Sequence, residues 1–295
     1  NHIKTGAELK SHKSRNHLKF PVMKRTHKVL ALLLAAGVFS FLQACQKDDG
    51  LISSSEVNLK KGEAVVNNAN PERTFYSSAR HIGNGQARAW VTENRDGEPT
   101  SVGLSVSAGA LNNLPQDMTG VVLELPKGKG RNFYTFVMLD WNPQGHEPPQ
   151  IYGLPHFDVH FYIIPDEERL AMVPDKVAEF ENLPTAEYVP AGYFRGPGFV
   201  PFMGVHWLDG ASPELHGATF TKTFIWGSYD GEFVFWEPML TRDYLLTRPD
   251  EIIDIPQPAA FRRDGWYPTR YEISYSKTGN EFIVALRDLQ FRQGQ

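Results

Sequence analysis

The chain has 295 residues, with 30 Lys and Arg against 34 Asp and Glu and a formal net charge of −4. The first 44 residues are basic, so the remainder is strongly acidic. An acidic surface repels phosphate backbones, which excludes nucleic acid as a partner. Cys45 is the only cysteine, so disulfides, zinc–thiolate sites and cysteine nucleophiles are excluded from the rest of the chain.

The segment before Cys45 has the order of a secretory signal. Lys24, Arg25 and Lys28 form a basic head, an uncharged apolar run covers 29–41, and small residues lead into the cysteine. This order is typical of a cleaved signal peptide, and Leu-x-Ala-Cys resembles the lipobox, where the cysteine is lipidated. We predict a lipoprotein signal peptide at 23–44, with lipid on Cys45 as the membrane contact. Residues 1–22 then represent an over-extended start.

A transmembrane anchor is the alternative interpretation of the apolar run. A spanning helix needs about 20 apolar residues, whereas this run is shorter and ends at small residues. We therefore expect a lipid-anchored protein of the bacterial outer membrane, on its periplasmic face or at the cell surface. Residues 45–73 are polar, as in a flexible tether. Within them, Lys47-Asp48-Asp49 resembles the export signal of surface-displayed lipoproteins.

Residues 74–295 have the pattern of a single β-rich domain. Short β-prone runs alternate with turn signals such as Tyr229-Asp230-Gly231. The predicted strands cover 87–92, 102–106, 120–125, 133–141, 155–164, 203–208, 219–228, 232–236, 269–276 and 281–286. Short helices are predicted at 166–170, 175–180 and 241–246, and a long loop at 184–201. The predicted fold class is mainly β, an antiparallel sandwich or barrel with a short helical insertion.

The run from His156 to Tyr162 is the best candidate for chemistry. Its odd positions are apolar and its even positions are His156, Asp158, His160 and Tyr162, which is the period of a strand. His-x-x-x-His also suits a helical zinc site, but the alternation argues against a helix. On a strand, residues four apart are separated by ~13 Å, so both histidines reach one ion only through a bulge.

Further ligands must come from other segments. His206 and Glu237 each lie in a β-prone run, and His146 and Glu147 lie in a loop upstream of His156. We predict that His156, Asp158, His160, His206 and Glu237 form one pocket that binds a divalent metal such as zinc, or otherwise a small polar ligand. His146 and Glu147 are predicted to bind a small polar ligand.

The chemistry of this pocket has more than one interpretation. In an enzyme, the metal would activate water or polarise a carbonyl, and a free His156 or His146 would move protons. In a non-catalytic envelope or binding module, the same groups would form a hydrogen-bond network. A carbohydrate-binding surface protein is the third alternative. Asp140 begins a calcium-loop pattern, but the twelfth position is Ile151 rather than Glu, so the pattern fails.

Several motifs resemble a known family. They are Gly145-His146-Glu147-Pro148, 154–162, Met203-Gly204-Val205-His206-Trp207, 227–231 and 235–239. Over about residues 75 to 290 the chain resembles a family of exported bacterial proteins of unknown function, typified by a sigma-E-controlled hypothetical protein of Thermus. The resemblance implies a mostly β domain and no particular activity.

Overall fold

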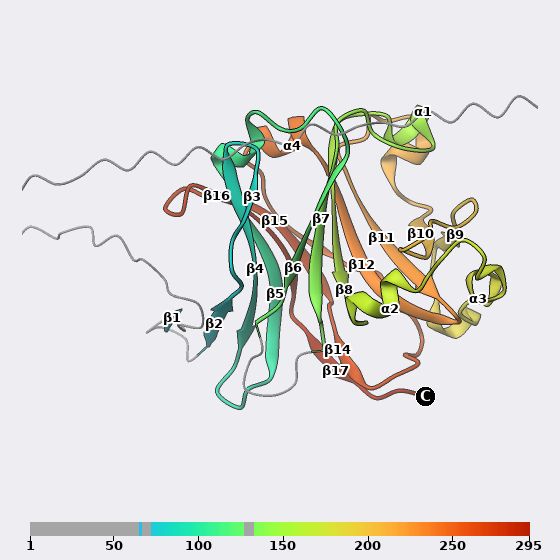
Figure 1. The fold of residues 1–295 in the computed structure, drawn as a ribbon. Coiled ribbons are helices and arrows are strands. Elements are labelled where there is room, and N and C mark those ends of the chain that lie inside the picture. Colours follow the sequence, from blue (N-terminus) through green and yellow to red (C-terminus); the bar gives the residue numbers. More distant parts are fainter. Residues whose placement is uncertain (1–64, 67–71, 127–132) are drawn as a thin grey trace, which may run out of the picture. The chain divides into compact units, whose positions relative to one another are not determined.

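A computed structural model describes residues 65–66, 72–126 and 133–295 (Figure 1). The predicted signal peptide, Cys45 and most of the predicted tether lie outside these ranges. No helix among the described residues is both long and apolar enough to cross a membrane.

Two large antiparallel sheets make up most of the fold. The first sheet has the order β1-β2-β4-β5-β16-β15-β13, and β3 also pairs with β4. Its strands are β1 (Val65–Val66), β2 (Arg73–Tyr76), β3 (Arg80–Ile82), β4 (Gly85–Glu93), β5 (Pro99–Ser107), β13 (Asp250–Asp254), β15 (Arg270–Ser276) and β16 (Glu281–Arg287). A small third sheet pairs β14 (Gly265–Tyr267) with β17 (Gln290–Arg292).

The second sheet has the order β6-β7-β8-β12-β11-β10-β9. Its strands are β6 (Thr119–Glu124), β7 (Phe136–Asn142), β8 (His156–Tyr162), β9 (Tyr193–Arg195), β10 (Val205–Asp209), β11 (Lys222–Tyr229) and β12 (Glu232–Thr241). Within the described residues neither large sheet closes on itself. The predicted mainly β antiparallel fold is therefore confirmed, in its sandwich form.

The two large sheets pack face to face around the hydrophobic core. Leu104 and Val284 from the first sheet line the same small interior space as Leu139, Val159 and Leu240 from the second. All five side chains are buried. The apolar odd positions of β8 thus face the first sheet, as the alternation predicts. The even positions of β8 must then lie on the outer face of the second sheet.

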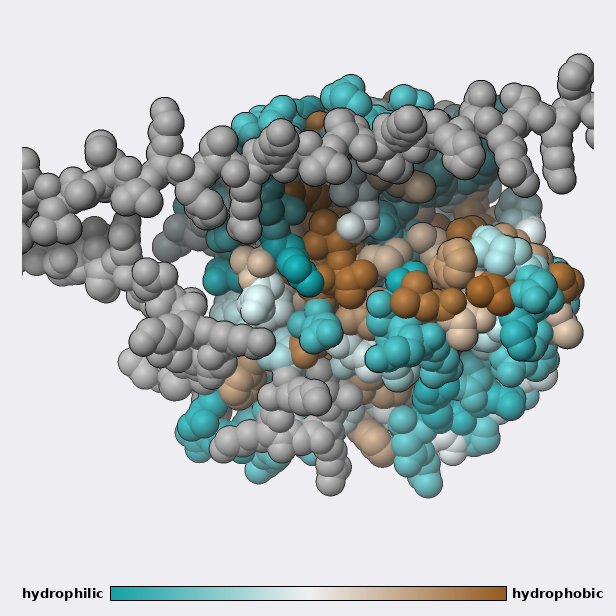
Figure 2. Space-filling view, viewed as in Figure 1, coloured by the Kyte–Doolittle hydropathy of each residue, from teal (hydrophilic) through white to brown (hydrophobic). Residues whose placement is uncertain are grey.

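Helices are short and lie between the strands in sequence. They are η1 (Ala108–Leu111), α1 (Pro149–Tyr152), α2 (Asp166–Leu170), α3 (Val177–Glu181), η2 (Ala186–Tyr188), η3 (Pro213–His216) and α4 (Arg242–Leu246). Three match the predicted helices, whereas α1 was not predicted. The predicted loop at 184–201 contains η2 and the short strand β9. Several apolar side chains of segment 165–205 remain exposed. Figure 2 shows brown atoms among teal ones at the right of the molecule, where Figure 1 places α2 and α3.

The outer face of the second sheet is covered rather than wet. Tyr152 of α1 joins Leu208, Phe220, Ile225 and Met239 in a second buried apolar cluster. Three of these residues, Leu208 on β10, Ile225 on β11 and Met239 on β12, belong to the sheet itself. Because this cluster and its loops cover the sheet, all seven residues of β8 are buried, polar positions included.

Candidate metal centre

Two neighbouring strands supply the polar side chains of the site. On β8, Asp158 and His160 point to the covered outer face, and all residues of β7 are buried as well. The β7–β8 register pairs Asp140 with Asp158 and Asn142 with His156. Each pair lies side by side on the same face of an antiparallel sheet. The β7 residues therefore extend the polar row of β8.

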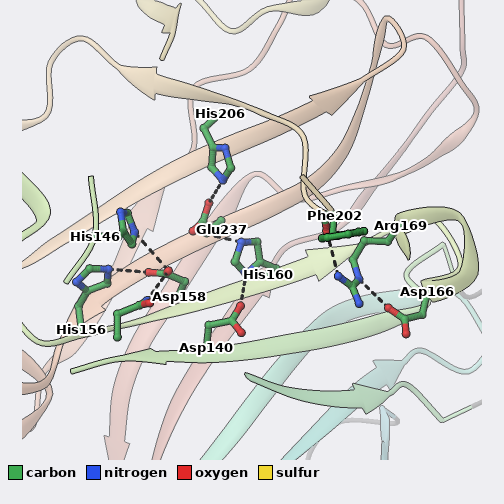
Figure 3. Close-up of polar contacts among 11 residues, drawn as sticks. Asp140, His146, His156, Asp158, His160, Asp166, Arg169, Phe202, His206 and Glu237 are labelled. Carbon is green, nitrogen blue, oxygen red and sulfur yellow. Dashed lines mark hydrogen bonds and ion pairs between the residues drawn. The ribbon is translucent and has the colours of Figure 1, made fainter. Parts of the chain in front are cut away.

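Three residues, His146, His156 and Asp158, form what we call the loop set (Figure 3). His156 Nε2 lies 3.1 Å from Asp158 Oδ1, and His146 Nε2 lies 3.4 Å from Asp158 Oδ2. His146 comes from the loop before α1, where its amide donates to the carbonyl of Tyr152. Gly145 makes this loop possible: its φ is +68°, and a Cβ there would lie 2.1 Å from the Tyr152 oxygen.

Backbone carbonyls fix the histidine rings of the loop set. His156 Nδ1 donates to the Leu154 carbonyl at 2.7 Å, and His146 Nδ1 donates to the Glu147 carbonyl at 2.9 Å. In a neutral imidazole the other nitrogen, Nε2, is then unprotonated and has a free lone pair. Both lone pairs face the Asp158 carboxylate, which itself accepts from Asn142 at 2.7 Å. Lone pairs face lone pairs unless a proton or a cation lies between them.

A second group, His160, His206 and Glu237, forms what we call the strand set. His160 Nε2 lies 3.3 Å from Glu237 Oε1, and His206 Nε2 lies 3.5 Å from Glu237 Oε2. The three residues come from β8, β10 and β12, so three strands converge (Figure 3). Between β10 and β12, Gly227 of β11 is paired with both His206 and Phe235. Without a Cβ at Gly227, the His206 ring and the Phe235 ring fit side by side over β11, 5.4 Å apart.

Asp140 extends the strand set behind His160. Its Oδ2 lies 3.4 Å from His160 Nδ1, on the side of the ring away from Glu237. A carboxylate at one nitrogen of a histidine commonly orients the other nitrogen toward a metal. Asp140 therefore occupies the position of an orienting group, with His160 Nε2 left for an ion.

Burial and mutual repulsion shape the titration of the three carboxyl groups. Burial, and then the charge of Asp158, raise the pKa of Asp140 to about 7. The same causes, with Asp140 added, raise the pKa of Glu237 well above its usual range. Burial alone would also raise the pKa of Asp158, but the adjacent imidazoles of His146 and His156 outweigh it and lower that pKa. The pKa of Glu237 is thus shifted toward the protonated form, and that of Asp158 toward the ionised form.

The pKa values of the histidines also differ between the two sets. Burial lowers the pKa of His160 to about 3 and that of His206 to about 4, so both rings are neutral at pH 7. Burial acts in the same direction on His146, but the adjacent Asp158 carboxylate overcomes it and raises the pKa of His146. The His146 side chain is 37% exposed and that of His206 is 20% exposed. These two residues are therefore the points where solvent reaches the two sets.

The spacing of these atoms is compatible with a bound metal ion. Two ligands held ~2.1 Å from zinc at the tetrahedral angle lie about 3.4 Å apart, and the observed N–O distances are 3.1 to 3.5 Å. Several of the buried atoms have no hydrogen-bond partner despite this proximity. They are His156 Nε2, Asp158 Oδ1, both ring nitrogens of His160, Asp140 Oδ2 and Glu237 Oε2.

The predicted single pocket is resolved into two adjacent sets. His160, His206 and Glu237 are brought together, while His156 and Asp158 join His146 instead. This division agrees with the argument that a regular strand keeps residues four apart from one ion.

Other residues depart from the predicted roles. The described contacts of Glu147 in the site are made by its backbone carbonyl. Asp140 and Asn142 were not predicted as site residues. The sequence signal for both residues was their alternate spacing at the start of the failed calcium-loop pattern.

The fold and the site define an antiparallel β-sandwich with a buried histidine–carboxylate face. Residues 94–141 match the family model TTHB210-like, described as hypothetical protein TTHB210, and this confirms the family resemblance predicted from the sequence. The matched segment runs from the turn after β4 into β7 and includes Asp140, whereas both ligand sets lie outside it. Neither the curated proteins nor the solved structures contain a match to the chain.

Proposed function

We propose that this protein is an exported, lipid-anchored β domain that binds a divalent transition-metal ion at its strand set. Two histidines and one carboxylate are a ligand group used by zinc and by non-haem iron, and they leave positions for water. The three ligands come from three strands of one sheet, which holds them more rigidly than loops would.

The environment of His160 carries the proposal. Its Nδ1 faces Asp140 and its Nε2 faces Glu237, yet neither nitrogen makes a hydrogen bond. A neutral imidazole has a single N–H, so it donates a hydrogen bond to only one of the two carboxyl groups. An ion bound to His160 Nε2, Glu237 and His206 uses the remaining lone pair and neutralises buried negative charge.

A hydrogen-bond network without metal is the competing function for the same residues. In that case protons on Glu237 and on the histidines take the place of the ion. The two functions differ in the metal content of the protein purified without added chelator.

The decisive experiment is elemental analysis of the full chain and of single variants. We expect stoichiometric metal in the wild type and its loss in His160→Ala and in Glu237→Gln. His81→Ala is the matched control, because His81 is exposed on β3 of the first sheet. Folding of each variant is checked by its thermal unfolding transition. If the wild type contains no metal and also fails to bind added zinc, manganese or iron(II), only the hydrogen-bond network remains as the function of these residues.

Export and anchoring are supported by the sequence before Cys45 alone. The test is metabolic labelling with palmitate in a bacterial host, followed by membrane fractionation. We expect a labelled, membrane-bound wild type and an unlabelled Cys45→Ser variant. An unlabelled wild type would contradict lipid anchoring without affecting the metal proposal.

A further inference from the structure

The loop set has the contacts of a prepared ligand group and not of a solvated polar face. His156 is fully buried, and its Nε2 has no hydrogen-bond partner although it lies 3.1 Å from Asp158. Each of the three side chains is oriented by a further bond: the two histidines donate to carbonyls, and Asp158 accepts from Asn142. Such outer partners are what fixes ligands around a metal.

The two sets lie next to each other on one strand. Asp158 and His160 occupy alternate positions of β8, so their Cα atoms are ~6.6 Å apart at the usual rise per residue. Asp140 links the sets, because it is paired with Asp158 in the sheet and its Oδ2 lies 3.4 Å from His160. In Figure 3, Asp158 lies beside His146 and His156, and the ring of His160 lies between Glu237 and Asp140.

The charge of this face depends on how many ions it holds. Three carboxylates, Asp140, Asp158 and Glu237, face four histidines that are neutral when they bind metal. With one divalent ion the ionised face has a net charge of about −1, and with two ions about +1. The nearby Arg169 does not change this result, since its guanidinium is paired with Asp166 at 2.7 Å. Only the doubly loaded face attracts an anion.

From this geometry we infer that the loop set binds a second divalent ion, and that the two ions together form a binding site for a small oxyanion such as phosphate. The inference rests on the proposed metal site at the strand set. The second ion is the more exchangeable one, because its ligand His146 is partly exposed and comes from a loop. The same exposure gives the anion its route to the metal.

The first test counts ions. Wild-type full chain, stripped with chelator and titrated with zinc against a chromophoric chelator, should bind two ions in steps at least tenfold apart. His146→Ala should lose only the weaker ion, and His206→Ala should weaken the stronger one. His146→Ala is preferred to His156→Ala because His156 is fully buried, which makes misfolding of that variant a risk. His81→Ala should behave as the wild type.

The second test measures the anion. Inorganic phosphate should bind the two-ion protein at least tenfold more tightly than His146→Ala holding one ion, as measured by calorimetry on dialysed samples. Trimethyl phosphate, which has a similar shape and no charge, should not bind either form. A wild type that holds only one ion overturns the inference and leaves the proposed function intact. If the wild type binds two ions but binds phosphate no more tightly than the one-ion His146→Ala protein, the inference is also overturned. If the wild type binds no metal at all, the proposed function itself is contradicted.

Discussion

Replacing Asp140 by asparagine should stabilise the metal-free protein at pH 8 and change its stability little at pH 4. The two side chains have nearly the same shape, so the substitution mainly removes a buried charge. Burial and the neighbouring Asp158 carboxylate raise the pKa of Asp140 from 3.8 to about 7 in the folded protein. In the unfolded chain the pKa returns to its ordinary value.

The sign and the size follow from proton linkage. The folded protein holds the Asp140 proton more tightly than the unfolded chain, so this group favours folding fully below pH 3.8. That contribution is lost as the pH rises toward 7. At ~1.4 kcal/mol for each pH unit, the loss in the wild type is about 4 kcal/mol of unfolding free energy. Asparagine has no proton to lose and avoids this loss.

Urea denaturation in the presence of chelator provides the assay. The unfolding free energies of the wild type and of Asp140→Asn are compared at each pH unit from 4 to 8, and their difference should grow with pH. Asp117→Asn, at an exposed position, is the control for the substitution of an aspartate outside the buried face. The reasoning is refuted if the Asp140→Asn difference does not change with pH. Zinc binding to Asp140→Asn should in addition be weaker by about 10- to 100-fold, because His160 loses its orienting carboxylate.

Three further outcomes are expected. Zinc binding near pH 7 should release a proton from Glu237, whose pKa burial raises, so a pH-independent affinity would contradict its role as a ligand. Gly227→Ala should cost roughly 1–3 kcal/mol of stability and also weaken metal binding, since the new Cβ would lie 1.9 Å from the ring of Phe235. Leu104→Ala should cost about 2–5 kcal/mol with unchanged metal content, because Leu104 lies between the sheets; metal loss in this variant would contradict the separation of core and site.

The strand at 156–162 was predictable because its alternation has a period of two over seven residues. The pattern correctly predicted that Asp158 and His160 share a face and that the odd positions enter the core. It did not reveal that the polar face is buried. That burial depends in part on Phe220, whose ring packs against His156 from a distant part of the chain, and a local pattern contains no information about such a contact.

The division into two sets depended on strand order. The sequence shows that His156 and His160 are too far apart for one ion on a regular strand, but it does not show which segments pair with β8. The β7–β8 register brings Asp140 beside Asp158, and the adjacent strand β12 brings Glu237 to His160. Register and order arise from the packing of the whole sandwich, so Asp140 was missed although its strand was predicted.

The number of ionisable groups on the buried face argues that the site is functional. Burying a charged group is costly unless a partner compensates it, and a purely structural face of this size would be more stable with apolar side chains. Here His160 remains neutral because burial lowers its pKa to about 3, so it stabilises no carboxylate through a positive charge. In the metal-free face burial favours a proton on Glu237, because it raises the pKa of that carboxyl group. A divalent ion would replace that proton and compensate the carboxylates at the same time, which gives the arrangement a physical reason that a hydrogen-bond network lacks.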